Sequence, residues 1–257
     1  MEFRLVFNEI PEAFDRWRLR YCQEAFDTII GHAALAPGKS MLEIGTGTGQ
    51  ATMPFLRTGC DYLGIELGDR LAALLREKCR GYDNFRLIQD DFITHDFGAA
   101  RFDLILSAAT IQWIDEEVAF PKCFALLKEG GVLAMMFTRR DYRTPNEALY
   151  QDIQRVYSAY FHPETPYTRR FAYDNAPAYG FTGLQRLEFH TTCVYTADEY
   201  AACVGTHCDH IVLREPDRSL FFSGIRDAIR RHGNAIKVLD TVVVYLARRG
   251  QASGAAT

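Results

Sequence analysis

The feature that most constrains the fold of this chain is a glycine-rich turn that follows a short apolar run. The run covers residues 40–44, and the turn Gly45-Thr46-Gly47-Thr48-Gly49 leads into a segment, 50–58, that can form a helix. Glycines lack a Cβ, so the backbone can bend sharply there and approach a ligand closely. In an open α/β sheet, such a turn lies beyond the carboxyl end of a strand, where ligands bind. The string therefore predicts a strand–turn–helix unit with a binding site at the turn.

Alternating strand-like and helix-like segments extend this unit into an α/β fold. Further strands are expected at 61–66, 85–89, 102–107 and 132–137, and helices at 11–35, 69–80 and 116–127. After residue 140, helices are expected at 145–160, 197–204 and 217–231 and strands at 184–194 and 238–247. Strands separated by helices imply a parallel sheet covered on both faces. We expect a doubly wound, seven-stranded, mostly parallel sheet with an antiparallel C-terminal strand pair and a helical cap.

Composition narrows the class of protein. The 257-residue chain has 33 acidic residues and 29 Lys and Arg, which gives a net charge of −4, and it has no basic block. A nucleic-acid partner is therefore not expected. No apolar run approaches the ~20 residues that span a bilayer, and no signal-peptide pattern opens the chain. The seven cysteines are scattered and contain no CxxC pair, which favours free thiols in the cytoplasm. The oligomeric state stays open.

Three ligand classes compete for the glycine turn. A phosphate-binding loop of the GxxxxGK[ST] type would need glycine at Ala33, and the Gly38-Lys39-Ser40 string leads into a strand rather than out of one. A dinucleotide fingerprint would need Gly or Ala where Gln50 stands. The third class, a nucleoside without a diphosphate, requires only the glycine turn.

Two acidic residues favour the nucleoside. Glu66 ends the second predicted strand, and Asp91 follows the third. An ionised carboxylate only accepts hydrogen bonds, so Glu66 can bind both ribose hydroxyls and Asp91 the adenine amino group. Phe92 adds an apolar wall and a backbone N–H.

These motifs resemble the class I S-adenosylmethionine-dependent methyltransferases of the small-molecule type that includes trans-aconitate methyltransferases (the methyltransferase type 11 group). The matching strings are 42–49, 64–67, 89–92, 102–107 and 126–131, with weaker similarity at 14–21, 195–200 and 245–249. The resemblance implies S-adenosylmethionine as the cofactor. It assigns cofactor contacts to Arg18, Tyr21, Glu43, Gly45, Thr46, Gly47, Gly49, Gln50, Glu66, Leu67, Asp91, Phe92 and Ser107.

The same resemblance implies a division of the chain by role. Residues 1–36 would close over the cofactor, 37–140 would form the cofactor-binding core, and 141–183 with 196–233 would form a cap for the substrate. Residues 184–195 and 234–249 would close the sheet, and 250–257 would be a disordered tail. Two departures from the family pattern stand out. Leu19 and Cys22 replace prolines near Arg18, and Gln112-Trp113 stands where His-Trp is usual.

Methyl transfer from a sulfonium is an in-line displacement, for which a protein mainly aligns the reactants and excludes water. No residue is identified as a catalytic base, and no metal site is expected. The expected acceptor is a small molecule, methylated on oxygen, with a carboxylate as one candidate because it needs no base. Weak substrate candidates are Gln112, Trp113, Arg139 and His207. Two alternatives stay open: a cofactor-binding protein without methyl transfer, and a nicotinamide-dependent oxidoreductase.

Overall fold

The computed structural model describes residues 3–163 and 170–250. Residues 251–257 of the expected tail lie outside the described residues. The chain divides into two compact units. The helical unit comprises the described residues within Met1–Leu19, Thr138–Thr168 and His190–Thr241, and the sheet unit those within Arg20–Phe137, Arg169–Phe189 and Val242–Thr257. The predicted division of the chain by role stays a prediction.

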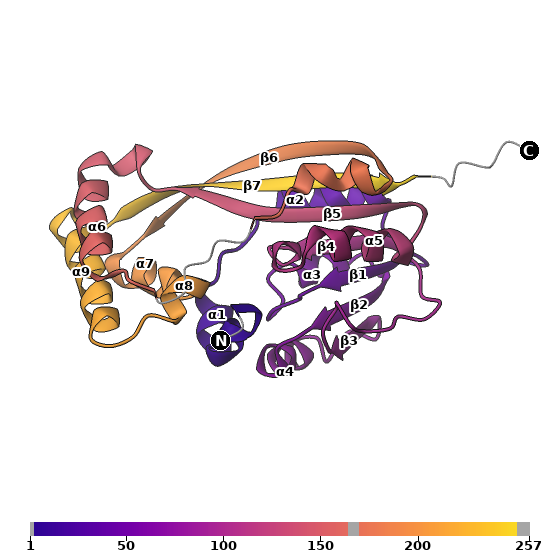
Figure 1. Ribbon diagram of the computed structural model, residues 1–257, viewed down its shortest axis with the longest axis horizontal. Coiled ribbons are helices and arrows are strands. Elements are labelled where there is room, and N and C mark those ends of the chain that lie inside the picture. The colour runs from indigo at the N-terminus through magenta and orange to yellow at the C-terminus, as the bar shows by residue number, and fades with distance from the viewer. Residues whose placement is uncertain (1–2, 164–169, 251–257) are drawn as a thin grey trace, which may run out of the picture. The chain divides into compact units, whose positions relative to one another are not determined.

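Seven strands form one sheet in the order β3-β2-β1-β4-β5-β7-β6 (Figure 1). The strands are β1 (Ser40–Ile44), β2 (Asp61–Glu66), β3 (Phe85–Gln89), β4 (Phe102–Ala108), β5 (Leu127–Asp141), β6 (Phe181–Tyr195) and β7 (Ile236–Arg249). Parallel pairing joins β3 to β2, β2 to β1, β1 to β4 and β4 to β5. Strand β7 lies between β5 and β6 and runs antiparallel to β6. The predicted fold class is confirmed.

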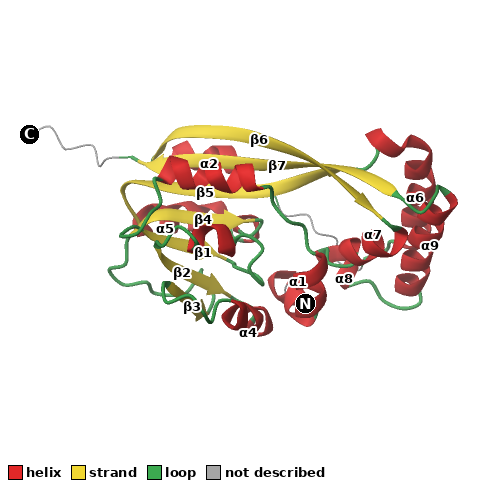
Figure 2. Cartoon of the chain, turned by 180° about the vertical axis from the view of Figure 1, so that it is seen from behind, coloured by secondary structure: helices red, strands yellow, loops and turns green. Residues whose placement is uncertain are grey.

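Helices alternate with the first strands of the sheet unit along the chain (Figure 2). They are α2 (Gln23–Ala33), α3 (Thr52–Leu56), α4 (Asp69–Lys78) and α5 (Glu116–Leu126), with short 3-10 turns η2 (Ile111–Trp113) and η4 (Tyr173–Tyr179). Successive strand residues point to opposite faces. Accordingly Met41 and Tyr62 join the apolar cluster on one face, and Leu42 and Ile65 the cluster on the other. Both faces are buried, as a parallel sheet requires.

The helical unit is built from α1 (Pro11–Trp17), α6 (Glu147–Tyr160), α7 (Ala197–Val204), α8 (Cys208–Ile211) and α9 (Asp217–Arg231), with 3-10 turns η1 (Phe3–Glu9) and η3 (Thr144–Asn146). Its core includes Ile153 and Val156 of α6 and Phe221 and Ile225 of α9. Over residues 3–163 and 170–250, no helix combines the length and the apolar character that a membrane crossing requires. None of the seven cysteines forms a disulfide.

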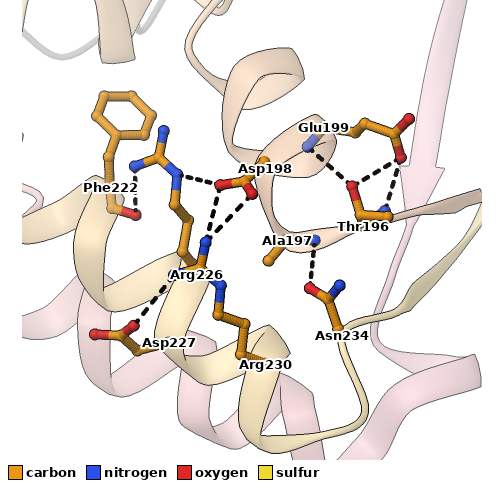
Figure 3. A network of polar contacts seen from close by, with 9 residues as sticks. All are labelled: Thr196, Ala197, Asp198, Glu199, Phe222, Arg226, Asp227, Arg230 and Asn234. Carbon is orange, nitrogen blue, oxygen red and sulfur yellow. Dashed lines mark hydrogen bonds and ion pairs between the residues drawn. The ribbon is translucent and has the colours of Figure 1, made fainter.

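Polar contacts fix α7 in the helical unit (Figure 3). Thr196 and Glu199 form a reciprocal capping box at the start of the helix. Asp198 accepts hydrogen bonds from Arg226 at 3.0 Å and from Arg230 at 3.2 Å, both on α9. Since Asp198 is exposed, these ion pairs add little stability, whereas the cap satisfies backbone groups that the helix leaves unpaired.

A buried ion pair joins two strands within the same unit. Arg140 of β5 donates from Nε to Asp240 of β7 at 2.8 Å and from Nη2 to the Tyr195 hydroxyl at 2.9 Å. Both charged side chains are almost fully buried. Buried charges are tolerated when they are paired and hydrogen-bonded, and this arrangement meets both conditions.

One element prediction is wrong. The expected helix over 11–35 is two helices, α1 and α2, separated by an extended segment that starts at Arg18 and ends at Cys22. The Arg18 guanidinium donates to the Thr206 carbonyl oxygen at 3.0 Å, across 188 residues of sequence. The spacing of apolar residues depends on local sequence only. It therefore does not predict the interruption between α1 and α2, where Arg18 bonds to a residue far along the chain.

Candidate functional site

The glycine turn follows β1 directly, and its first glycine cannot be replaced without strain. Gly45 has a φ of +67°, and a Cβ built on it would lie 2.2 Å from Cγ2 of Thr110. The Gly45 N–H donates to the Ile65 carbonyl at 2.8 Å, and the Thr110 hydroxyl donates to the Gly45 carbonyl at 3.1 Å. The turn is therefore held between β2 and the loop after β4.

The rest of the turn is held by hydrogen bonds within the turn and by one from α4. The Gly49 N–H donates to the Thr46 carbonyl at 3.0 Å, and Lys78 of α4 donates to the Thr48 carbonyl at 2.8 Å. Gln50, expected to contact the cofactor, donates from Nε2 to the Thr48 hydroxyl at 2.8 Å. Gly47 and Gly49 both have positive φ, the region that glycine enters without cost.

Glu66 lies against this turn, as the order of the strands predicts. One carboxylate oxygen accepts from the Gly47 N–H at 2.7 Å, and the other accepts from the Gly68 N–H at 2.9 Å. Burial raises the pKa of Glu66, while the backbone N–H groups of Gly68, Gly47 and Leu67 oppose the rise. A carboxylate offers about four lone-pair positions, so each oxygen retains capacity for a further donor.

The loop after β3 carries Asp91 and Phe92 at the same edge of the sheet, because Glu66 and Gln89 are register partners. Asp91 accepts from the Ile93 N–H at 2.9 Å. Phe92 is buried, with the Lys122 ammonium 5.1 Å from its ring centroid. Lys122 donates to the Ile93 carbonyl at 3.0 Å and to the His95 carbonyl at 2.7 Å. These bonds fix the loop in one conformation beside the glycine turn.

Thr46 within the turn is unusual among the described residues. It is 2% exposed, and its hydroxyl is buried with no hydrogen-bond partner. Its methyl group approaches β2, where a Cβ on Gly64 would lie 2.7 Å from it. A buried hydroxyl without a partner costs free energy, so a polar ligand or an ordered water there would be stabilising.

Glu43, also expected at the cofactor, lies inside the core on β1. Its Oε2 accepts from the Thr52 hydroxyl at 2.9 Å and from the Tyr62 hydroxyl. Burial raises the pKa of Glu43 to about 7, although both hydrogen bonds oppose the rise. The side chain thus connects the strand before the glycine turn to the helix after it.

Ser107 lies near the end of β4, and Gln112 and Trp113 lie in the segment that follows the strand. The buried Ser107 hydroxyl accepts from the Ile111 N–H at 2.8 Å. Gln112 donates to the Ala109 carbonyl at 3.0 Å and accepts from the Tyr173 hydroxyl at 3.1 Å. An amide does not ionise near neutral pH, so Gln112 offers no general base where the family pattern has histidine. Trp113 ends the short turn η2.

The remaining candidates fall in different units. Tyr21 belongs to the sheet unit, where its ring meets Phe26 edge-on at 6.1 Å. Arg18, Arg139 and His207 belong to the helical unit. The Arg18 guanidinium lies 5.3 Å from the Phe14 ring centroid. Burial, together with the charges of Arg18 and His210, lowers the pKa of His207 well below its usual value.

Sequence reasoning missed Thr110, which contacts the predicted site residue Gly45. Thr110 stands three residues after Ser107, at the same edge as the other strand-end loops, so its position relative to β4 was an available signal. Tyr173 of η4 contacts another predicted site residue, Gln112. In the helical unit, His210 contacts Asp209 at 2.7 Å and the Tyr157 hydroxyl at 2.9 Å.

Comparison with known proteins finds a family match for part of this chain. Residues 42–135 match the family model of the methyltransferase domain. A demethylmenaquinone methyltransferase of Tropheryma whipplei (strain Twist) is 29% identical over 150 residues, which cover 52% of this chain and 58% of the relative. The chain therefore spans little more than half the length of this curated relative.

Solved structures agree on the fold. The phosphoethanolamine N-methyltransferase 2 of Haemonchus contortus, in complex with S-adenosylhomocysteine, has a TM-score of 0.60 at 16% identity and covers 98% of this chain and 61% of that chain. The YcgJ protein of Bacillus subtilis also has a TM-score of 0.60, at 13% identity over 90% of this chain and 100% of that chain. The predicted family resemblance and fold are confirmed.

Proposed function

We propose that this chain, whose residues 42–135 form a methyltransferase domain of the class I fold, binds S-adenosylmethionine and transfers its methyl group to a small-molecule acceptor. The observation that carries the proposal is the strand-end geometry of the sheet unit. The glycine turn after β1 lies against Glu66 of β2, and the Asp91 loop follows the adjacent β3. This edge offers one side-chain-free surface and two carboxylates to a single ligand.

The described residues suit that cofactor. The glycine turn lies so close to Thr110 and Leu75 that a Cβ on Gly45 or Gly49 would clash with them, and Thr46 provides a buried hydroxyl without a described partner. Glu66 would accept from the ribose hydroxyls and Asp91 from the adenine amino group, with Phe92 as an apolar wall. The turn does not have the P-loop pattern that binds a diphosphate, and the lysine beside it, Lys78, donates to the Thr48 carbonyl. Both observations favour a nucleoside over a dinucleotide.

The bound cofactor would supply an activated methyl group on a positively charged sulfur. The protein then has three tasks: to orient the methyl carbon, to align the acceptor opposite the sulfur, and to exclude water. Glu66, Asp91 and the glycine turn would perform the first. Ser107, near the end of β4, would contact the cofactor, and Gln112 and Trp113 in the loop after β4 would border the acceptor.

We further propose that the acceptor is methylated on oxygen, with a carboxylate as the simplest case. The support is chemical: Gln112 occupies the place of a histidine base and does not ionise, and a carboxylate needs no deprotonation. The name of the relative from Tropheryma whipplei adds a quinone-type acceptor as a second class to test. A cytoplasmic location and the exclusion of nucleic-acid acceptors stay predictions.

The test is methyl transfer from S-adenosylmethionine that carries a labelled methyl group. Panels of small carboxylic acids, phenols and demethylated quinones are incubated with the full chain, and labelled product and S-adenosylhomocysteine are measured by mass spectrometry. We expect stoichiometric product and S-adenosylhomocysteine from at least one panel. Tight cofactor binding without product in any panel would instead support a binding protein of the same fold.

Glu66→Ala tests the cofactor site separately. We expect the dissociation constant for S-adenosylhomocysteine to rise by roughly 10–100-fold, because hydrogen bonds to a charged acceptor contribute about 1.5–3 kcal/mol. Asp61→Ala, at the exposed start of the same strand, is the matched control and should bind as the wild type does. Unchanged affinity in Glu66→Ala would show that Glu66 does not contact the ribose.

A further inference from the structure

Beneath the glycine turn of the sheet unit lies a buried carboxyl group that the proposed chemistry does not use. Glu43 is 1% exposed and sits at the fourth position of β1. Its neighbours on the same face of the sheet include Met41, Leu104 and Leu106, all fully buried. A carboxyl group in such surroundings costs free energy unless it is hydrogen-bonded, so its contacts call for an explanation.

Those contacts connect the two ends of the turn. Glu43 stands two residues before Gly45, and Thr52 begins the helix that follows the turn. Oε2 of Glu43 accepts from the Thr52 hydroxyl at 2.9 Å and from Tyr62 on β2, and the two hydroxyls lie 3.1 Å apart. One carboxyl oxygen therefore bridges β1, β2 and α3 across the base of the turn.

We propose that Glu43 is a positioning residue, which holds the glycine turn in its cofactor-binding conformation through Thr52 and Tyr62 rather than by touching the cofactor. We call Glu43, Thr52 and Tyr62 the clasp. This inference rests on the proposed function for its effect on cofactor affinity, but the effect on the turn itself does not depend on it.

Protonation of Glu43 controls the strength of the clasp. An ionised carboxylate accepts both hydroxyl donors, and hydrogen bonds to it are roughly twice as strong as those to a neutral acid. Burial and, to a smaller extent, the nearby charge of Glu66 together raise the pKa of Glu43 to about 7, although the two hydrogen bonds oppose the rise. The titratable groups that face Glu43 are Tyr62 and Glu66 on β2 and the Cys79 thiol after α4. The clasp is therefore weaker below about pH 7 than above it.

The first test measures cofactor affinity against pH in the wild type and in Glu43→Gln, which keeps the shape but does not titrate. S-adenosylhomocysteine is the ligand, and its own amino group titrates alike in both experiments. The dissociation constant of Glu43→Gln divided by that of the wild type therefore reports Glu43 alone. We expect this ratio to be near one at about pH 5.5 and to grow about threefold to tenfold by about pH 8.5. Tyr62→Phe removes one donor and should move the rise to higher pH.

Thr58→Val is the matched control for Thr52→Val. Thr58 lies just after the other end of α3 and donates to the Phe55 carbonyl at 2.7 Å, so its loss removes a hydroxyl without touching the clasp. Thr58→Val should follow the wild type at every pH, while Thr52→Val should follow Tyr62→Phe. Thermal melts of each variant establish that it is folded. A ratio that stays constant with pH in folded Glu43→Gln overturns the proposal.

The second test needs no cofactor. Amide hydrogen exchange is followed at Gly47 and Gly49, whose N–H groups are bonded to Glu66 and to the Thr46 carbonyl. Corrected for intrinsic exchange, their protection should rise with pH through about 7 in the wild type and stay level in Glu43→Gln. If the wild type shows this rise but binds no S-adenosylhomocysteine at any pH, the proposed function fails and the clasp stands. Protection that does not change with pH in either protein would contradict the proposed role of the clasp.

Discussion

At the scale of single residues, the site consists of side chains whose positions are fixed by backbone groups. Glu66 is fixed by the N–H groups of Gly47 and Gly68, and Asp91 by that of Ile93. Such positions follow from residue type and strand order, which is why the sequence predicts them. Thr110 was not predicted, because its contact with Gly45 spans 65 residues of sequence. Glu43 was predicted as a cofactor contact, and only the three-dimensional packing reveals its bonds to Thr52 and Tyr62.

Gly45→Ala tests whether the turn requires glycine. An alanine there combines a φ of +67° with a Cβ 2.2 Å from the Thr110 methyl carbon. We expect the free energy of unfolding to fall by roughly 2–4 kcal/mol, about 1–2 from the left-handed backbone and the rest from the clash.

The control for this change is Gly31→Ala in α2, where a Cβ meets nothing within 4 Å. It should leave the protein as stable or raise the unfolding free energy by up to about 1 kcal/mol, since alanine favours helices over glycine. Urea denaturation measures both variants. Equal stability of Gly45→Ala and Gly31→Ala would contradict the geometry of the turn.

At the scale of elements, the sequence predicts best where periodicity and boundary residues agree. The bounds of β2, β3, α7 and α9 match their predictions, and each has a clear change of pattern at its ends. The prediction of a single helix over 11–35 is wrong because the helical spacing of apolar residues continues through Arg18–Cys22, whereas the backbone is extended there. The short helix α8 (Cys208–Ile211) was missed, since four residues are too few for a period to show.

Thr196→Ala tests how much the capping box of α7 contributes. The change removes the acceptor for the Glu199 N–H and leaves the helix start without its side-chain cap. We expect the unfolding free energy to fall by about 0.5–2 kcal/mol. Thr196→Ser retains the hydroxyl and should lose far less. If both variants lose the same amount, the methyl group rather than the cap stabilises this helix end.

At the scale of the whole chain, alternation of strands and helices was enough to predict a seven-stranded doubly wound sheet. No local sequence pattern predicts that β7 lies between β5 and β6. No local pattern predicts the division into two units either, because the boundary between the units falls inside the continuous strands β5 and β7. The loops at the carboxyl ends of β1, β2 and β3 form the candidate cofactor site within one unit. Strand order predicts that these loops share one edge of the sheet, and their contacts with a cofactor stay a prediction.

Stability against pH is a property of the whole chain to which Glu43 contributes measurably. Its pKa is about 7 in the folded protein against 4.5 for the ordinary group, so the folded state binds more protons between these values. Unfolding free energy is therefore lost as pH rises from about 4.5 through 7. A carboxyl group whose pKa rises from 4.5 to about 7 on folding lowers the unfolding free energy by about 3 kcal/mol above that range.

Urea unfolding at about pH 5 and pH 8 measures this loss in the wild type and in Glu43→Gln. Other titrating groups act alike in both proteins, so the difference between the two losses reports Glu43. We expect the wild type to lose about 2–3 kcal/mol more than Glu43→Gln over this range. An equal loss would place the pKa of Glu43 near its ordinary value.

The most direct test of the central claim is calorimetric titration of the full chain with S-adenosylhomocysteine, with NADH titrated in parallel. We predict saturable heat corresponding to one site per chain for the nucleoside, a strong reduction in Glu66→Ala, and none for NADH. Absence of heat and of a thermal shift at millimolar S-adenosylhomocysteine, together with binding of NADH, would contradict it.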